Sequence, residues 1–209
     1  MKWQKLPPTF YAAPTLEVAQ ALLGKYLVRR VGKTFMVGKI VETEGYIAAI
    51  DAACHAYRGM TERNRVMFGA AGHAYVYFAY GNHFMLNVVT EPEGEAAAVL
   101  IQALEPIEGI DAMKTFRPVE KLTDLLSGPG KLTQAMNITR SLNGMSFQSD
   151  ELFVAEGEAV EPHQIGISTR IGISQAQDLP WRYFIKGNPF VSKGKPSASV
   201  PSLNAKVKH

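Results

Sequence analysis

Hydrophobic and polar positions alternate along several short stretches of the chain, a pattern typical of half-buried β-strands. Strands are expected over 26–30, 34–46, 97–104, 168–173 and 181–185, and as a hairpin over 73–87. Apolar residues at helical spacing predict a helix from Thr15, its cap, to Leu23, with Gly24 after its end. Shorter helical segments are expected over 51–58, 107–116, 121–126 and 131–136, and an extended arm over 1–13.

The hairpin over 73–87 has the most distinctive pattern of the chain. A two-residue type II′ turn at Gly81–Asn82 is expected, because glycine adopts a positive φ without steric cost. Tyr75 and Tyr77 point to one face of the first arm, and Tyr80 lies at the tip. On this stretch alone the pattern is best explained by a hairpin whose tyrosines pack and hydrogen-bond, but a tip ring can also be inserted into a partner.

Composition adds limits to this picture. The 209 residues, 46% of them hydrophobic, suffice for one domain, and no stretch is apolar enough to span a membrane. The first residues contain no apolar signal-peptide region, and Cys54 is the only cysteine, so a reducing intracellular compartment is expected. The net charge of +3 permits a polyanionic partner without requiring one.

The chain ends in a segment of different composition. Residues 193–209 are rich in Ser, Pro, Ala and Lys and contain no acid, so we expect a disordered basic tail after a single domain over 1–192. Such a tail aids solubility or is weakly attracted to a nucleic-acid backbone.

Two carboxylates share one face of the predicted strand 34–46. Strict alternation places Ile40, Glu42, Glu44 and Tyr46 on the same side. A carboxylate pair can divide acid and base roles, although solvent-facing carboxylates are the commoner case. His55 could join the pair as a metal ligand, but no clustered histidine pattern supports this, and no metal is expected.

The segment Gly128–Lys131 resembles a phosphate-binding loop only superficially. The NTPase loop needs a glycine where this chain has Leu125 and a Ser or Thr where it has Leu132. A glycine-rich turn with Lys131 in the first helical turn can still bind a phosphate, but the signal is weak, and without further context an ordinary turn-to-helix junction is the better explanation.

Read in order, these blocks resemble the alkyladenine (3-methyladenine, methylpurine) DNA glycosylase family over about 16–192. The resemblance rests on IVETEGY, ERNRVMFG, HAYVYFAYGNHFMLNVV, AVLIQALEPIEG, GPGKLTQAMNIT, RIGI and PWRYFIKGNPFVS. It implies a mixed α/β fold, a single domain with a curved, mainly antiparallel β-sheet surrounded by helices and a protruding β-hairpin.

The resemblance also implies an activity. Members of the family excise alkylated or deaminated purines, such as 3-methyladenine, 7-methylguanine and hypoxanthine, from duplex DNA in base excision repair. The resemblance implies a monofunctional enzyme, because no lysine stands where a Schiff base would form, and one that needs no cofactor. We therefore expect damaged double-stranded DNA as the partner, no membrane, a monomer, and a cytoplasmic location, on the nucleoid if the source is bacterial.

The family pattern assigns roles to individual residues of this chain. Glu44 would hold and deprotonate the attacking water, with the backbone carbonyl of Ile171 as a further water contact. The base pocket would comprise Tyr46, His55, Tyr77 and Asn87, and Tyr80 would fill the vacated stack. Candidates for DNA backbone contacts are Arg63, Arg65 and Lys131.

Two positions depart from the family pattern. Gln102 stands where the family commonly has an arginine that helps Glu44 hold the water, and Asn82 replaces an apolar residue after the hairpin glycine. We expect activity with an altered rate or substrate preference, and an inactive relative remains an alternative. Two other classes stay open, a non-catalytic protein that binds damaged DNA and a hydrolase of free nucleosides or nucleotides.

Overall fold

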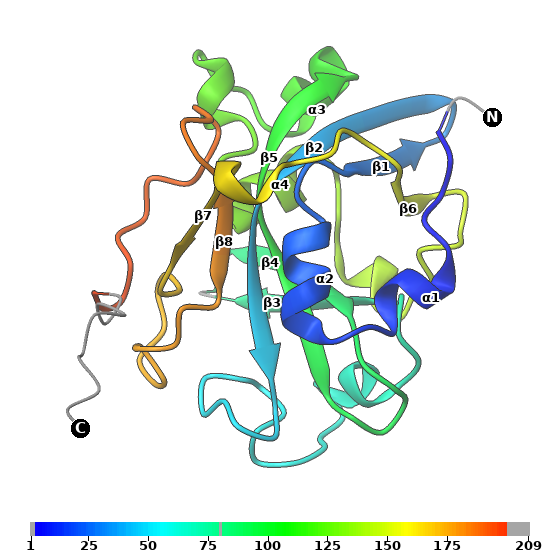
Figure 1. Ribbon diagram of the computed structural model, residues 1–209. Coiled ribbons are helices and arrows are strands. Elements are labelled where there is room, and N and C mark those ends of the chain that lie inside the picture. Colours follow the sequence, from blue (N-terminus) through cyan, green and yellow to red (C-terminus); the bar gives the residue numbers. More distant parts are fainter. Residues whose placement is uncertain (1–2, 80, 200–209) are drawn as a thin grey trace.

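Eight strands form one antiparallel sheet in the computed structural model, which describes residues 3–79 and 81–199 (Figure 1). The strands are β1 (Tyr26–Val31), β2 (Thr34–Ile47), β3 (Ala74–Ala79), β4 (His83–Val89), β5 (Ala97–Glu108), β6 (Leu152–Ala155), β7 (Ile165–Ser168) and β8 (Arg182–Ile185). The helices are α1 (Pro8–Tyr11), α2 (Thr15–Ala21), α3 (Ile110–Phe116) and α4 (Pro129–Ala135), with the 3₁₀ turns η1 (Arg65–Phe68), η2 (Leu122–Asp124), η3 (Arg140–Leu142) and η4 (Pro162–Gln164).

The strand order is β3-β4-β5-β2-β1-β6, and a separate hairpin, β7–β8, joins through the pairing of β8 with β2. The sheet is curled rather than flat, with α2 on one side of the long β2–β5 pair and the β7–β8 hairpin on the other (Figure 1). These features confirm the predicted mixed α/β fold with a curved, mainly antiparallel sheet. Its helices are short, and strands provide most of the framework.

Strand β2 separates the main core from the candidate site. On the core side the Thr43 hydroxyl donates to the Ala19 carbonyl of α2 at 2.8 Å. A Cβ at Gly45 would lie 2.6 Å from the Leu16 side chain, so glycine lets α2 approach the strand closely. Glu44 therefore projects to the opposite face, because side chains alternate along a strand.

The predicted alternation is correct for β3 and fails at one place in β2. Val76 of β3 packs in the main core, whereas Tyr75 and Tyr77 belong to a smaller cluster on the other face. In β2 the register with β5 shifts between Ile40 and Glu42, so Ile40 packs in the main core rather than sharing the face of Glu42. The cause is a β-bulge, which inserts an extra residue and interrupts the period of two.

The hairpin turn differs from the prediction. Ala79 pairs with His83, so three residues connect the strands rather than two. The Asn82 N–H donates to the Ala79 carbonyl at 3.3 Å, and Gly81 has a φ of 73°. The predicted tip residue, Tyr80, lies outside the described residues.

Several predicted boundaries also need correction. Residues 51–58 form successive turns rather than a helix. The Asp51 carboxylate accepts the Ala53 N–H at 3.0 Å, as an N-cap would, but the backbone hydrogen bonds that follow join residues three apart and do not continue as an α-helix. Helix α2 begins at Thr15, which is helical and not the cap; its N–H and hydroxyl both donate to Glu91. The strand expected over 168–173 ends at Ser168.

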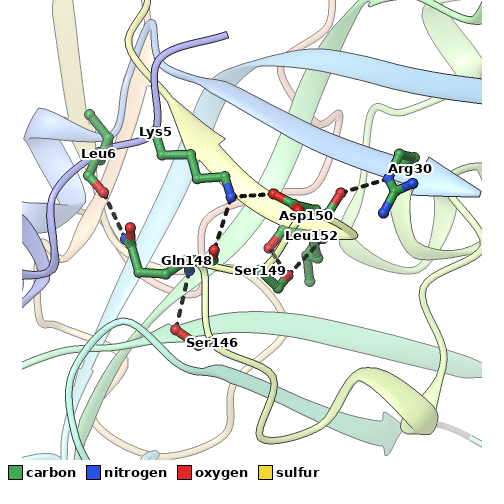
Figure 2. Close-up of polar contacts among 8 residues, drawn as sticks. All are labelled: Lys5, Leu6, Arg30, Ser146, Gln148, Ser149, Asp150 and Leu152. Carbon is green, nitrogen blue, oxygen red and sulfur yellow. Dashed lines mark hydrogen bonds and ion pairs between the residues drawn. The ribbon is translucent and has the colours of Figure 1, made fainter. Parts of the chain in front are cut away.

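The N-terminal segment is anchored beside β6, at the opposite end of the strand order from β3 (Figure 2). Lys5 Nζ contacts Asp150 at 2.7 Å and the Gln148 carbonyl at 2.9 Å, and the Gln148 amide donates to the Leu6 carbonyl at 2.8 Å. The expected extended arm over 1–13 is therefore partly helical, as α1, and is held by defined bonds.

The first part of the predicted tail makes contacts with the domain. The Ser197 N–H donates to the Arg170 carbonyl at 2.8 Å, and Ile171 forms a bridge with Pro196. Residues 200–209 lie outside the described residues. Among the described residues, no helix has the length and apolar character needed to cross a bilayer.

Candidate active site

Glu44 is fully buried on the inner face of β2 and receives two hydrogen bonds. The Ile171 N–H donates to Oε1 and the Tyr46 hydroxyl donates to Oε2, each at 2.8 Å. Burial raises the pKa of Glu44 from 4.5 to about 7, and these two hydrogen bonds oppose that rise. A carboxyl group with this pKa exchanges protons near neutral pH, which suits general acid–base chemistry.

The predicted pocket residues come together beside Glu44. Tyr46, His55, Tyr77 and Asn87 line a narrow hollow of about 20 Å³, which holds about one water molecule. The rings of His55 and Tyr77 meet edge to face, with centroids 4.5 Å apart. The hollow opens into a cleft of about 650 Å³, whose wall includes Gln102 and Ile171. Six predicted site residues thus line one cleft: Tyr46, His55, Arg63, Tyr77, Gln102 and Ile171.

A buried tyrosine that the sequence prediction did not single out orients His55. The Tyr75 hydroxyl lies 3.1 Å from His55 Nδ1, and the Asn87 amide donates to the Tyr75 carbonyl at 3.1 Å. Burial, together with the nearby charge of Arg63, lowers the pKa of His55, so its ring is neutral at pH 7. The pocket therefore presents a neutral imidazole.

Gln102 carries an unusual feature in the cleft wall. The residue is 5% exposed, and its Oε1 atom is buried without a hydrogen-bond partner among the described residues. Leaving a buried acceptor unpaired costs about 1–3 kcal/mol. Such a cost is typical of functional positions, where a polar group is held ready for a bound molecule.

Behind the pocket lies a buried ion pair that the sequence patterns did not predict. Arg170 and Asp51 are both fully buried and form a bidentate contact, with N–O distances of 2.5 and 2.8 Å. The Arg170 guanidinium lies 4.6 Å from the centroid of the Tyr46 ring. Arg170 belongs to the RIGI block and Asp51 precedes His55, but their pairing spans 119 positions and has no local sequence signal.

Glu42, the other carboxylate of the predicted pair, is paired separately. Arg182 Nε lies 2.6 Å from Glu42 Oε1, and the Ser192 N–H and hydroxyl also donate to this carboxylate. These bonds join β2 to β8 and to the segment that follows it. The hydrogen bonds of Glu42 thus tie segments of the fold together, whereas Glu44 lies beside the aromatic pocket.

The three predicted DNA-backbone contacts differ in their position relative to the cleft. Arg63 lines the cleft, with its guanidinium 5.6 Å from the centroid of the Tyr77 ring and a 3.3 Å bond to the Phe78 carbonyl. Arg65 is exposed and lies 3.7 Å from Glu62. Lys131 lies 3.5 Å from Asp124, outside the set of cleft-lining residues.

Comparisons with known proteins show the family of this chain. The family model for methylpurine-DNA glycosylase (MPG) matches residues 9–189. A protein of Chlorobium phaeobacteroides (strain BS1) is 52% identical over 193 residues, which cover 92% of this chain and 97% of that protein. A protein of Carboxydothermus hydrogenoformans is 52% identical over 189 residues, covering 90% and 98% respectively. Both bear the provisional name of a 3-methyladenine DNA glycosylase. The chain therefore belongs to the methylpurine-DNA glycosylase family.

Proposed function

We propose that this protein is a monofunctional DNA glycosylase that releases alkylated purines, 3-methyladenine foremost, from duplex DNA. The observation that carries the proposal is the position of Glu44, a buried carboxyl group with a pKa near neutrality beside an aromatic pocket. The family and the names of its relatives support the same reaction. An enzyme of this kind initiates base excision repair and works inside the cell where the chromosome is, on the nucleoid if the source is bacterial.

The damaged base binds between aromatic rings after rotating out of the helix. Tyr46 and Tyr77 provide flat faces, and a cationic base such as 3-methyladenine or 7-methylguanine gains about 0.5–2 kcal/mol from such a face. The hollow of about 20 Å³ is far smaller than a purine, so the edge-to-face contact of His55 with Tyr77 opens as the base enters. Asn87, on the pocket wall, crowds the exocyclic amino group of normal guanine.

Glu44 acts on the water that replaces the base. The C1′–N bond breaks and its electron pair leaves with the purine, while the water oxygen bonds to C1′ and a water proton passes to Glu44. The anionic carboxylate also stabilises the positive charge that develops on the sugar. The Gln102 amide and the backbone of Ile171 supply further contacts to this water from the cleft wall.

The DNA strand remains intact in this reaction. The residues that line the described cleft include no lysine that could form a Schiff base with the abasic sugar. Neutral altered purines such as hypoxanthine are accepted more slowly, because they lack the cation–π contribution. Tyr80 fills the gap that the extruded base leaves in the stack. The DNA backbone is contacted by Arg63, Arg65 and Lys131. The protein acts as a monomer.

Base release from a defined duplex tests the proposal. A duplex with one hypoxanthine, and DNA methylated to contain 3-methyladenine, are incubated with the wild-type protein, Glu44→Gln and Glu17→Gln. Glu17 is an exposed residue of α2 and serves as the matched control. We expect release by the wild type and by Glu17→Gln, and loss of at least about a hundredfold in Glu44→Gln.

The same experiment separates the other two classes of function. A protein that only binds damaged DNA would retain the duplex on a gel and release no base. A hydrolase of free nucleosides would act on methylated nucleosides and would not require the duplex. Either result would contradict the proposed function.

A further inference from the structure

One guanidinium group joins three separate segments of the chain behind the candidate active site. Arg170 donates to the Gly45 carbonyl of β2 at 3.0 Å, to the Asp51 carboxylate, and to the Ala176 carbonyl at 3.3 Å. Asp51 belongs to the turns that carry His55, and its Oδ1 also accepts the Ala53 N–H. A buried ion pair therefore links the segments that form the walls of the pocket.

The same residue is next to both groups that act on Glu44. Its guanidinium lies over the rings of Tyr46 and Trp181, at 4.6 and 5.3 Å from their centroids. The following residue, Ile171, donates its backbone N–H to Glu44. The Arg170 carbonyl accepts the Ser197 N–H, so the peptide that carries the Ile171 amide is held on its other side as well.

Charged and titratable groups from several elements surround Glu44. On β2 they are Tyr46, which donates to Glu44, and Glu42, which is paired with Arg182 of β8 and whose negative charge still raises the pKa of Glu44. The segment after β7 contributes Arg170, whose charge favours the ionised form of Glu44. Asp51 and Cys54 lie beyond Arg170, and burial raises the pKa of Cys54 to about 11, so its thiol is neutral. Among the described residues that line the cleft, those of β5 are Leu100 and Gln102, and both are uncharged.

From this arrangement we propose that Arg170 and Asp51 are positioning residues for the glycosylase reaction, and that the charge of their pair controls the ionisation of Glu44. The inference rests on the proposed function. Arg170 acts through the Tyr46 ring, the Ile171 amide and its own field. Asp51 limits that field, because its negative charge partly cancels the guanidinium charge at the position of Glu44.

A purely structural role predicts something different. A buried ion pair that only ties segments together could be replaced by apolar groups, and removing either partner would weaken the fold in the same way. Control of Glu44 requires opposite effects from the two partners. Loss of the Arg170 charge makes Glu44 harder to ionise, and loss of the Asp51 charge makes it easier.

The test therefore compares Arg170→Gln with Asp51→Asn. The carboxyl carbon of Glu44, labelled with ¹³C, is titrated by NMR in the free protein, and the acid limb of single-turnover base release is measured on the same variants. We expect the Glu44 midpoint to rise in Arg170→Gln and to fall in Asp51→Asn, so the two shifts have opposite signs. The affinity for DNA should stay within about twofold, because both residues are fully buried.

Three further variants complete the design. Asp150→Asn is the matched control, because it removes the carboxylate of a different ion pair, Lys5–Asp150 beside β6 (Figure 2). It should leave the Glu44 midpoint unchanged. Arg170→Lys keeps the charge and should restore the midpoint. The double variant Asp51→Asn with Arg170→Gln removes both charges and should bring the midpoint back toward the wild-type value.

Midpoints that move in the same direction in the two single variants, or that do not move, would overturn the inference. If Arg170→Gln does not fold, the sign of the shift in the near-isosteric Asp51→Asn decides alone. The NMR titration does not depend on base release, so it can fail while the proposed function holds. Conversely, absence of base release by the wild type would refute the proposed function without moving this titration.

Discussion

Tyr46 donates a hydrogen bond of 2.8 Å to Glu44 from two positions further along the same strand. One side chain thus serves two purposes, because its ring lines the pocket and its hydroxyl holds the carboxylate. The hydrogen bond favours the ionised form of Glu44 and opposes the effect of burial on its pKa. Burial also raises the pKa of Tyr46 itself well above 10, so the hydroxyl keeps its proton and remains a donor.

Tyr46→Phe separates these two purposes. The ring remains available to stack on the base, but Glu44 loses a donor and its pKa rises further above 7. We expect the acid limb of the single-turnover rate to move to higher pH by about half a unit or more, with little change in DNA affinity. The control is Tyr26→Phe on β1, the strand that pairs with β2 on the side away from β5, and it should keep the wild-type pH profile.

Glu44 should also make the stability of the protein depend on pH. Its pKa in the folded state, about 7, lies above its ordinary value of 4.5, so the unfolded chain ionises first as pH rises. The resulting loss of folding stability is absent below about pH 4.5 and grows between about pH 4.5 and 7. Above that range it is constant, at no more than about 3 kcal/mol of unfolding free energy.

Glu44→Gln removes this penalty. We expect the variant to be more stable than the wild type at pH 8, with a gain that shrinks as pH falls toward 5. Urea denaturation at pH 5, 6.5 and 8 measures the difference, and Glu17→Gln again serves as the control. A difference in unfolding free energy that is the same at all three pH values would show that Glu44 is not the responsible group.

The sequence was sufficient wherever the relevant contacts are local. Alternation over Tyr75, Val76 and Tyr77 correctly assigned the two faces of β3, and proximity along β2 placed Glu44 beside Tyr46. The order of the motifs extended this to residues on different elements, since the family pattern brings His55, from the turns over 51–58, and Tyr77 of β3 into one pocket.

The missed features depend on distant contacts or on a local shift of register. Arg170 and Asp51 are 119 positions apart, and nothing in either neighbourhood distinguishes a buried pair from two exposed charges. The bulge near Val41 changes which face Ile40 occupies, and periodicity alone does not reveal it. The turns over 51–58 do not continue as a helix, because Asp51 is paired with Arg170 and the His55 carbonyl accepts the Asn64 amide instead of a helical N–H; these contacts override local propensity.

Tyr80 should matter for duplex substrates and not for single strands. Filling the vacated stack offsets the cost of extruding a base, a few kcal/mol that a single strand largely avoids. We expect Tyr80→Ala to lower single-turnover excision from a duplex at least about tenfold, Tyr80→Phe to retain most of the rate, and both to act normally on single strands. Tyr57→Ala removes an exposed tyrosine elsewhere and should have no effect. Equal losses on the two substrates would remove Tyr80 from the extrusion step.

Gln102 gives a prediction in which stability and activity move apart. Gln102→Leu removes the unpartnered Oε1 from the cleft wall and should leave the protein at least as stable as the wild type. If the amide holds the attacking water, the same change should lower the single-turnover rate by about tenfold, since one hydrogen bond is lost in the transition state.

Gln102→Arg reverses the departure from the family pattern and tests the same position by charge. A guanidinium at this point of the wall favours the ionised form of Glu44, so the acid limb should move to lower pH. Single-turnover excision of 3-methyladenine between pH 5 and 8, together with urea denaturation, measures both variants. An unchanged rate in both would show that Gln102 is not coupled to the water, and the cost of its unpaired oxygen would then have no catalytic explanation.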